Sequence, residues 1–173
     1  MFREPRKLCS EPDLYASAIR ALMRRAHSVY EMRQALERRA EDKSAARKVL
    51  DRLREQKLLD DARYARQFVR YHMEIRRQGK FRIARDLRVR GIADRDIDAA
   101  FEEAFQQNDE SAIVRKRIVN KLKMFRGEMD DRKMASLYRS LLRAGFSAEV
   151  IRRELRAATK ADPGELIASE EDL

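Results

Sequence analysis

The stretch of sequence that decides the fold is LLDDARYARQFVRYHMEIRRQGKFRIARDLRVRGI, residues 58–92. It opens with Asp60 and Asp61, and carboxylates in this position cap a helix and oppose the positive end of its dipole. The Gln78-Gly79-Lys80 tripeptide interrupts the helical spacing of the apolar residues, and Arg90-Gly91-Ile92 ends a second helical segment with a glycine suited to a left-handed cap. The stretch therefore predicts two helices joined by a short turn.

The rest of the chain extends this helical pattern. Proline occurs only at positions 5, 12 and 163, so nothing between Asp13 and Asp162 forbids a helix on that ground. β-branched residues are sparse, and strict apolar–polar alternation is absent. The sequence predicts an all-α protein with about nine helices, whose caps are Ser10 or Asp13, Ser28, Asp42, Asp60 or Asp61, Asn108 or Asp109, and Ser147.

Apolar residues at helical spacing predict which face of each helix is buried. In the helix that follows Asp61, the expected inward residues are Ala65, Phe68, His72 and Ile75. The helix after Asn108 is expected to bury Val114, Ile118, Leu122 and Phe125.

The chain also repeats itself. The segment around Gly91 aligns with the segment around Gly145, and residues 32–53 supply a third copy. Four apolar positions coincide: Met32, Ile83 and Leu137; Leu36, Leu87 and Leu141; Ala46, Ile97 and Ile151; and Leu50, Phe101 and Leu155. Because each unit alone is too small to hold much of a core, neighbouring units are expected to pack against one another.

The expected architecture is an elongated, curved tandem array of three three-helix repeats, covering residues 13–59, 60–107 and 108–161. Residues 1–12 are expected to be a mobile basic leader, and residues 162–173 an acidic, disordered tail with five acids and no base. Gly91 and Gly145 are expected to end helices in the left-handed conformation. Ala40 stands at the matching place in the first repeat, where the turn must be built differently or bear strain.

Composition narrows the class of protein. Charged residues make up 40% of the chain and aromatic residues 7%, and the net charge is +10. This excess favours attraction to a polyanion or to an acidic protein surface, although it also fits a solvated helical surface. One cysteine, Cys9, and the lack of a signal-peptide core or a spanning apolar run favour a soluble cytoplasmic protein.

The sequence contains little that could catalyse a reaction. It has two histidines, no Gly-rich phosphate loop and no zinc-binding spacing, so no cofactor, metal or small-molecule ligand is expected. His72 is expected to be a structural histidine and His27 a capping residue. We therefore predict a binding protein and not an enzyme.

Basic residues gather on helix faces. Arg82, Arg85 and Arg88 are expected to project opposite Ile83 and Leu87, with Lys80 at the preceding turn. Arginines 63, 66, 70 and 77 are expected to lie opposite Phe68. Residues 111–127 carry no acid. The candidate binding residues are Arg66, Arg70, Arg77, Lys80, Arg82, Arg85, Arg88, Arg115, Lys116, Lys123 and Arg126.

Such faces could follow a phosphate backbone or an acidic protein groove. A base-reading platform is not indicated, because Tyr30, Tyr71 and Tyr138 are better interpreted as core or rim residues. Any contact with DNA is therefore expected to be independent of its sequence.

Two ordered motifs resemble the signature of the RecX family of bacterial recombinase regulators. The first is Leu-Asp-Asp-x-Arg-Phe/Tyr-Ala, matched by Leu59, Asp60, Asp61, Arg63, Tyr64 and Ala65; Phe68 follows. The second is matched by Gly79, Arg82, Ile83, Leu87, Arg90 and Gly91. An earlier motif is represented by Ala18, Arg20, Leu22, Arg25, Ser28, Glu31 and Met32. The resemblance covers about residues 15–158, and Ala40 departs from the glycine common at its position.

The resemblance implies a tandem three-helix-repeat protein that binds the RecA filament on single-stranded DNA. It further implies that the protein limits filament growth, ATP hydrolysis, strand exchange in homologous recombination and SOS induction during DNA repair, without catalytic residues. The alternative is a helical DNA- or RNA-binding protein that acts without a recombinase.

Overall fold

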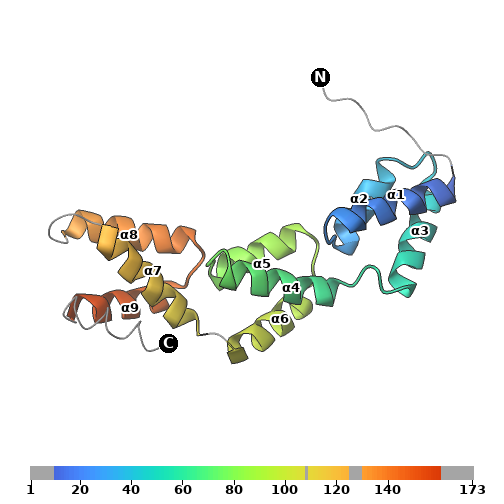
Figure 1. Cartoon of the computed structure of the whole chain (residues 1–173). Coiled ribbons are helices and arrows are strands. Elements are labelled where there is room, and N and C mark those ends of the chain that lie inside the picture. Colours follow the sequence, from blue (N-terminus) through green and yellow to red (C-terminus); the bar gives the residue numbers. More distant parts are fainter. Residues whose placement is uncertain (1–9, 108, 125–129, 161–173) are drawn as a thin grey trace, which may run out of the picture. The chain divides into compact units, whose positions relative to one another are not determined.

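The computed structural model describes residues 10–107, 109–124 and 130–160, and all regular structure in these ranges is helical (Figure 1). The nine helices of this described part are α1 (Glu11–Arg24), α2 (Val29–Glu37), α3 (Lys43–Glu55), α4 (Asp61–Glu74), α5 (Lys80–Val89), α6 (Asp94–Gln107), α7 (Glu110–Met124), α8 (Asp131–Arg143) and α9 (Ala148–Lys160). The predicted all-α class is confirmed. The predicted acidic tail and most of the predicted leader lie outside the described residues.

The chain forms two compact units. The first comprises residues 1–67 and 86–100, and the second residues 68–85 and 101–173. Helices α4, α5 and α6 each contribute residues to both units. The three repeat boundaries proposed from the sequence stay a prediction, as does the elongated, curved arrangement.

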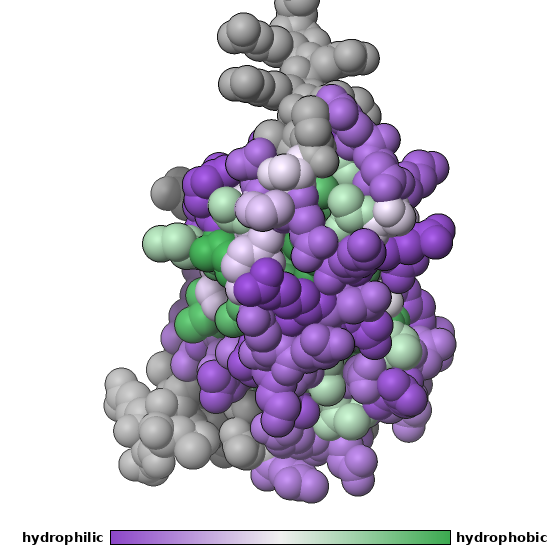
Figure 2. All heavy atoms as spheres, turned by 90° about the vertical axis from the view of Figure 1, so that its right-hand side faces the viewer, coloured by the Kyte–Doolittle hydropathy of each residue, from purple (hydrophilic) through white to green (hydrophobic). Residues whose placement is uncertain are grey.

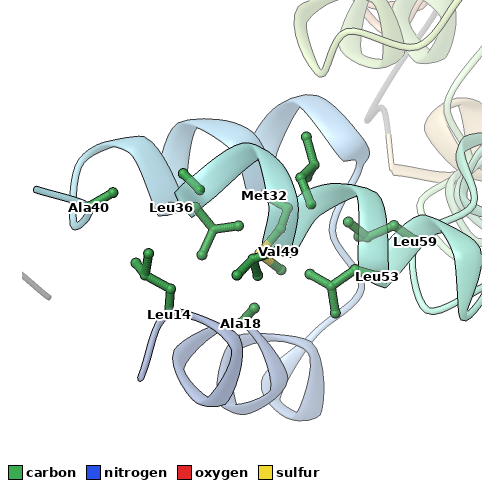
Figure 3. Packing of buried hydrophobic residues seen from close by; sticks show 10 residues of the cluster. Leu14, Ala18, Met32, Leu36, Ala40, Val49, Leu53 and Leu59 are labelled. Atoms are coloured by element: carbon green, nitrogen blue, oxygen red, sulfur yellow. The ribbon is translucent and has the colours of Figure 1, made fainter. Parts of the chain in front are cut away.

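Helices α1, α2 and α3 share one hydrophobic core in the first unit. In Figure 3, Leu14 and Ala18 from α1 point toward Met32 and Leu36 from α2, and Val49 from α3 lies between them. Leu14, Met32 and Val49 have no exposed surface. At about 25 cal/mol per Å² of buried apolar area, such side chains contribute about 1.5–3 kcal/mol each.

The repeat predicted from the sequence is visible as a pattern of burial. Every aligned position is buried, from complete burial at Met32, Ile83, Leu87 and Ile151 to 7% exposure at Leu50 and Leu155. In the second unit, Val114, Ile118, Leu137, Leu141 and Ile151 belong to the core that α7, α8 and α9 share. Phe125, which was expected to join them, lies outside the described residues.

Polar side chains start the helices at the expected places. Ser28 and Glu31 form a complete capping box at α2, and Ser10, Asp42, Asp109 and Ser147 accept from backbone amides at α1, α3, α7 and α9. At α4, Asp60 is the cap, because its Oδ1 accepts from the Arg63 amide at 2.8 Å. Asp60 therefore fills the capping position that the sequence left open between two aspartates.

Asp61 has a different role. Its Oδ1 accepts from the amide of Val29 at 2.9 Å, so the first residue of α4 is bonded to the start of α2. Beside it, the Ser28 hydroxyl donates to the carbonyl of Arg90 at 2.7 Å. Burial raises the pKa of Asp61, and the negative charges of Asp96 and Asp60 act in the same direction. These two hydrogen bonds join the start of α2 to the start of α4 and to the residue that follows α5.

The predicted inward face of α4 was partly wrong. Ile75 still donates its amide to the Tyr71 carbonyl at 3.0 Å, as in a helix, but its side chain is 65% exposed and lies outside the buried face. Val69 and Met73 are buried instead, on the side of the helix that Ala65 begins. Phe68 and His72 are half-buried, with ring centroids 3.9 Å apart.

The three repeat turns differ as expected. Gly91 and Gly145 have positive φ angles of 75° and 94°, which confirms their role as left-handed caps. Ala40 is not among the positive-φ residues; it is buried, and its amide donates to the Leu36 carbonyl. The first turn is therefore built differently, without left-handed strain at this position.

Apolar surface is limited on the face in Figure 2, where hydrophilic side chains cover most of the described atoms. Within the described residues, no helix combines the length and the apolar character needed to cross a membrane.

Candidate nucleic-acid interface

Helix α5 presents its arginines to solvent as predicted. Arg82, Arg85 and Arg88 are exposed, while Ile83 and Leu87 on the same helix have no exposed surface. The charge of Arg88 is partly offset, because its Nε donates to Asp94 Oδ1 at 2.7 Å. An ion pair this exposed is worth about 0–1 kcal/mol and leaves the arginine available to another partner.

Helix α4 carries three of the four arginines that the sequence placed on it. Arg63, Arg66 and Arg70 are exposed on it, but Arg77 lies beyond its end, in the turn before α5. The φ angle of Arg77 is 52°, a left-handed conformation that is uncommon for a residue with a side chain. The predicted placement of Arg77 on the helix face was wrong, since the helix had already ended.

Lys80 is oriented by aromatic rings. Its Nζ lies 5.4 Å from the ring centroid of Phe101 and 5.9 Å from that of Phe105, both on α6. Its backbone amide donates to Glu110 Oε1 at 3.2 Å. These contacts hold Lys80 against α6 and the start of α7.

In the basic run on α7, one arginine pairs with a buried carboxylate and other basic residues are exposed. Arg115 Nε donates to Glu154 Oε2 at 3.0 Å, and Glu154 is only 4% exposed, so Arg115 belongs to an ion pair that supports the packing of α7 on α9. Lys116 and Lys123 are exposed. Arg126 lies outside the described residues.

The motif residues of the sequence act largely as scaffold. Tyr64 is 8% exposed, and its pKa is raised by burial and by the negative charge of Glu31. His72 Nδ1 lies 2.7 Å from Gln78 Oε1, a contact that ties α4 to the following turn. Arg63 donates to the carbonyl of Lys57 at 2.9 Å.

Gly79 allows two turns to meet back to back. Its amide donates to the carbonyl of Ala144 at 2.9 Å, and the amide of Phe81 donates to the carbonyl of Gly145 at 3.0 Å. A Cβ atom on Gly79 would lie closer than 3.0 Å to backbone atoms of Gly145 and Phe146. The absence of a side chain is therefore what brings the α4–α5 turn against the α8–α9 turn.

This junction gathers arginines from four elements. Arg117 on α7 donates from Nη1 to the carbonyl of Arg77 at 2.8 Å, and its guanidinium lies 5.8 Å from the ring centroid of Phe146. Arg82 Nη1 lies 3.4 Å from the carbonyl of Arg143. Burial lowers the pKa of Arg117, and the positive charges of Arg77 and Arg82 lower it further.

Sequence reasoning missed part of this cluster. It listed Arg77 and Arg82 as candidate binding residues but included neither Arg117 nor Arg143. Phe81, which is 64% exposed at the same junction, was also overlooked. The local pattern gave no signal for these residues, because they are brought together only by the contact between the two turns.

Three-helix groups with exposed arginine faces define this chain as a helical-repeat protein. Within the described residues, no group of His, Cys, Asp and Glu side chains could bind a metal ion. The regulatory protein RecX of Halorhodospira halophila is 38% identical over 147 residues, which cover 84% of this chain and 88% of the relative. The first and second three-helix domains of RecX match residues 15–53 and 60–100. The chain belongs to the RecX family.

Further similarities agree with this assignment. The regulatory protein RecX of Prosthecochloris aestuarii is 33% identical over 131 residues, covering 76% of this chain and 83% of the relative. The crystal structure of RecX from Lactobacillus salivarius has a TM-score of 0.73 at 19% identity and covers 87% of this chain and 97% of its own. A second crystal structure, of regulatory protein RecX, has a TM-score of 0.75 at 23% identity; the match covers 84% of this chain and 73% of the other. These two structures support the fold.

Proposed function

We propose that this protein is a negative regulator of the RecA recombinase that binds the RecA filament on single-stranded DNA. Membership in a family whose members are named regulatory proteins supports a regulatory role. The observation that carries the proposal is the exposed arginine face of α5, which lies within the motif that most specifically matches the family.

A rigid basic face suits this partner for a physical reason. A nucleoprotein filament offers acidic side chains and DNA phosphates along its length, and guanidinium groups bind both in bidentate fashion. Arg82 and Arg85 lie on a helix whose opposite side is anchored by the fully buried Ile83 and Leu87. The helix that carries the arginines is therefore fixed before binding, which limits the entropy lost on association to that of the side chains.

By binding along the filament, the protein would limit filament growth, ATP hydrolysis and strand exchange. The test is a titration of the purified protein into RecA-catalysed ATP hydrolysis that depends on single-stranded DNA. We expect inhibition at amounts of protein well below those that saturate the DNA. Inhibition only after the DNA is saturated would favour the alternative, a sequence-independent nucleic-acid-binding protein that competes for the strand.

A further inference from the structure

We propose that Arg77, Arg82, Arg117 and Arg143 form a binding site for a phosphodiester group of single-stranded nucleic acid. The inference rests on the proposed function and specifies where this chain would hold the strand. The site lies within the second compact unit, where the α4–α5 turn meets the end of α8 and the middle of α7.

The site is assembled by two backbone hydrogen bonds and by one side-chain hydrogen bond to a backbone carbonyl. The bonds from Gly79 to Ala144 and from Phe81 to Gly145 join the two turns. The third contact runs from Arg117 to the carbonyl of Arg77 and fixes α7 to the same place. Because this framework exists before any ligand arrives, the backbone that carries the arginines need not rearrange on binding.

The charges at this site are unbalanced. Within residues 10–107, 109–124 and 130–160, none of the four arginines forms an ion pair with a carboxylate. The side chains of Arg82 and Arg117 donate to the backbone carbonyls of Arg143 and Arg77. Burial lowers the pKa of the half-buried Arg117, and the like charges of Arg77 and Arg82 lower it further. A bound anion would relieve this repulsion.

The geometry of the arginines suits a phosphate. Arg117 donates a hydrogen bond to the Arg77 carbonyl and lies over the ring of Phe146, so two contacts orient its guanidinium. A phosphodiester presents two non-bridging oxygens and one negative charge, and planar guanidinium groups donate two parallel hydrogen bonds to such a group.

An exposed aromatic ring favours nucleic acid over an acidic protein surface. Phe81 precedes Arg82 on α5, is 64% exposed, and is bonded through its amide to the same junction. Its apolar ring offers no hydrogen bond to a carboxylate. A ring beside a phosphate site offers a stacking surface for an unpaired base, and such stacking contributes about 1–3 kcal/mol per base.

The test uses the full chain and a labelled oligothymidylate, with binding followed by fluorescence anisotropy over a range of salt concentrations. The test variant is R82Q/R143Q, which removes two exposed guanidinium groups and keeps the side-chain stems. The matched control, R132Q/R152Q, removes the same charge from exposed positions on α8 and α9 that lie outside the cluster. A second variant, R82K/R143K, keeps the charge and loses the planar fork.

For R82Q/R143Q we expect at least about a tenfold loss of affinity relative to the control, since hydrogen bonds to charged groups have roughly this effect. The slope of log affinity against log salt should fall by about 0.7, the value for one phosphate contact on a single strand. R82K/R143K should be intermediate. An abasic strand of equal length should show the same loss, because the contact is with phosphate.

Equal affinity and equal salt slope in R82Q/R143Q and the control would overturn the site. So would a variant that keeps its affinity for DNA but loses inhibition of RecA, because the arginines would then bind an acidic protein surface. If R82Q/R143Q fails to fold, as judged by circular dichroism, R82K/R143K is compared with the control instead, and equal affinity in the two would overturn the site. The proposed function fails separately, if the wild-type chain does not inhibit RecA at all.

Discussion

The contact between the α4–α5 and α8–α9 turns can be tested with a single methyl group, by the substitution Gly79→Ala. The new Cβ atom would lie less than 3.0 Å from the carbonyl carbon and oxygen of Gly145 and the amide nitrogen of Phe146, where ordinary contacts begin at 3.4 Å. These are backbone atoms, so no change of rotamer can relieve the overlap. The two turns must move apart.

The cost follows from the bonds that this movement breaks. The hydrogen bonds from Gly79 to Ala144 (2.9 Å) and from Phe81 to Gly145 (3.0 Å) would stretch beyond useful length. Each donor left without a partner costs about 1–3 kcal/mol. Restricting the unfolded chain offsets about 0.4–1 kcal/mol. We expect the free energy of unfolding to fall by roughly 2–4 kcal/mol.

The assay is urea unfolding followed by circular dichroism, together with hydrogen exchange at the Phe81 amide. The control is Ser136→Thr, which adds one methyl group at an exposed position of α8 and should change stability by less than about 0.5 kcal/mol. If Gly79→Ala matches this control and the Phe81 amide stays protected, the contact between the turns does not exist as described.

Three further predictions concern other features. Burial raises the pKa of Asp61, so the folded state favours the neutral carboxyl group. The stability gained from the protonated group is complete below the ordinary pKa of 3.8 and is lost as pH rises through the raised pKa of the folded state. Asp61→Asn keeps the acceptor oxygen and should be more stable than wild type at neutral pH but not at pH 3 in thermal melts; a neutral-pH loss would contradict this. Gly145→Ala combines a φ of 94° with a Cβ crowded by Arg82, and we expect it to cost at least about 2 kcal/mol in urea unfolding; wild-type stability would refute the contact. Reversing the charges of Arg82, Arg85 and Arg88 should leave the helical spectrum unchanged and raise the concentration needed to inhibit RecA at least about tenfold, since single hydrogen bonds to charged groups already have that effect; unchanged inhibition would show that another face binds.

The core could be predicted from the sequence because burial in a helix repeats every three or four residues. All aligned positions of the three repeats, from Met32 to Leu155, are buried. The prediction was wrong at Ile75, because Ala65, Val69 and Met73 form the buried face of α4, and at Arg77, which lies in the turn after the helix. The first error chose the wrong apolar residues for the buried face, and the second extended the helical spacing past the end of the helix.

Contacts between distant segments could not be predicted in this way. Asp61 resembles a second capping residue until the structure places it on the amide of Val29. Arg117 is one basic residue among several on α7 until the α4–α5 turn brings the carbonyl of Arg77 within 2.8 Å. Each depends on which backbone atoms meet across a turn, and no local spacing records that information.

The central claim is that the partner is the RecA filament and not bare DNA. Cosedimentation measures this most directly, with the protein mixed either with single-stranded DNA or with the same DNA covered by RecA. Salt would first be raised until binding to bare DNA is lost, since that contact depends on counterion release. Under this condition we expect the protein still to sediment with the filament. Protein that stays in the supernatant with both would contradict it.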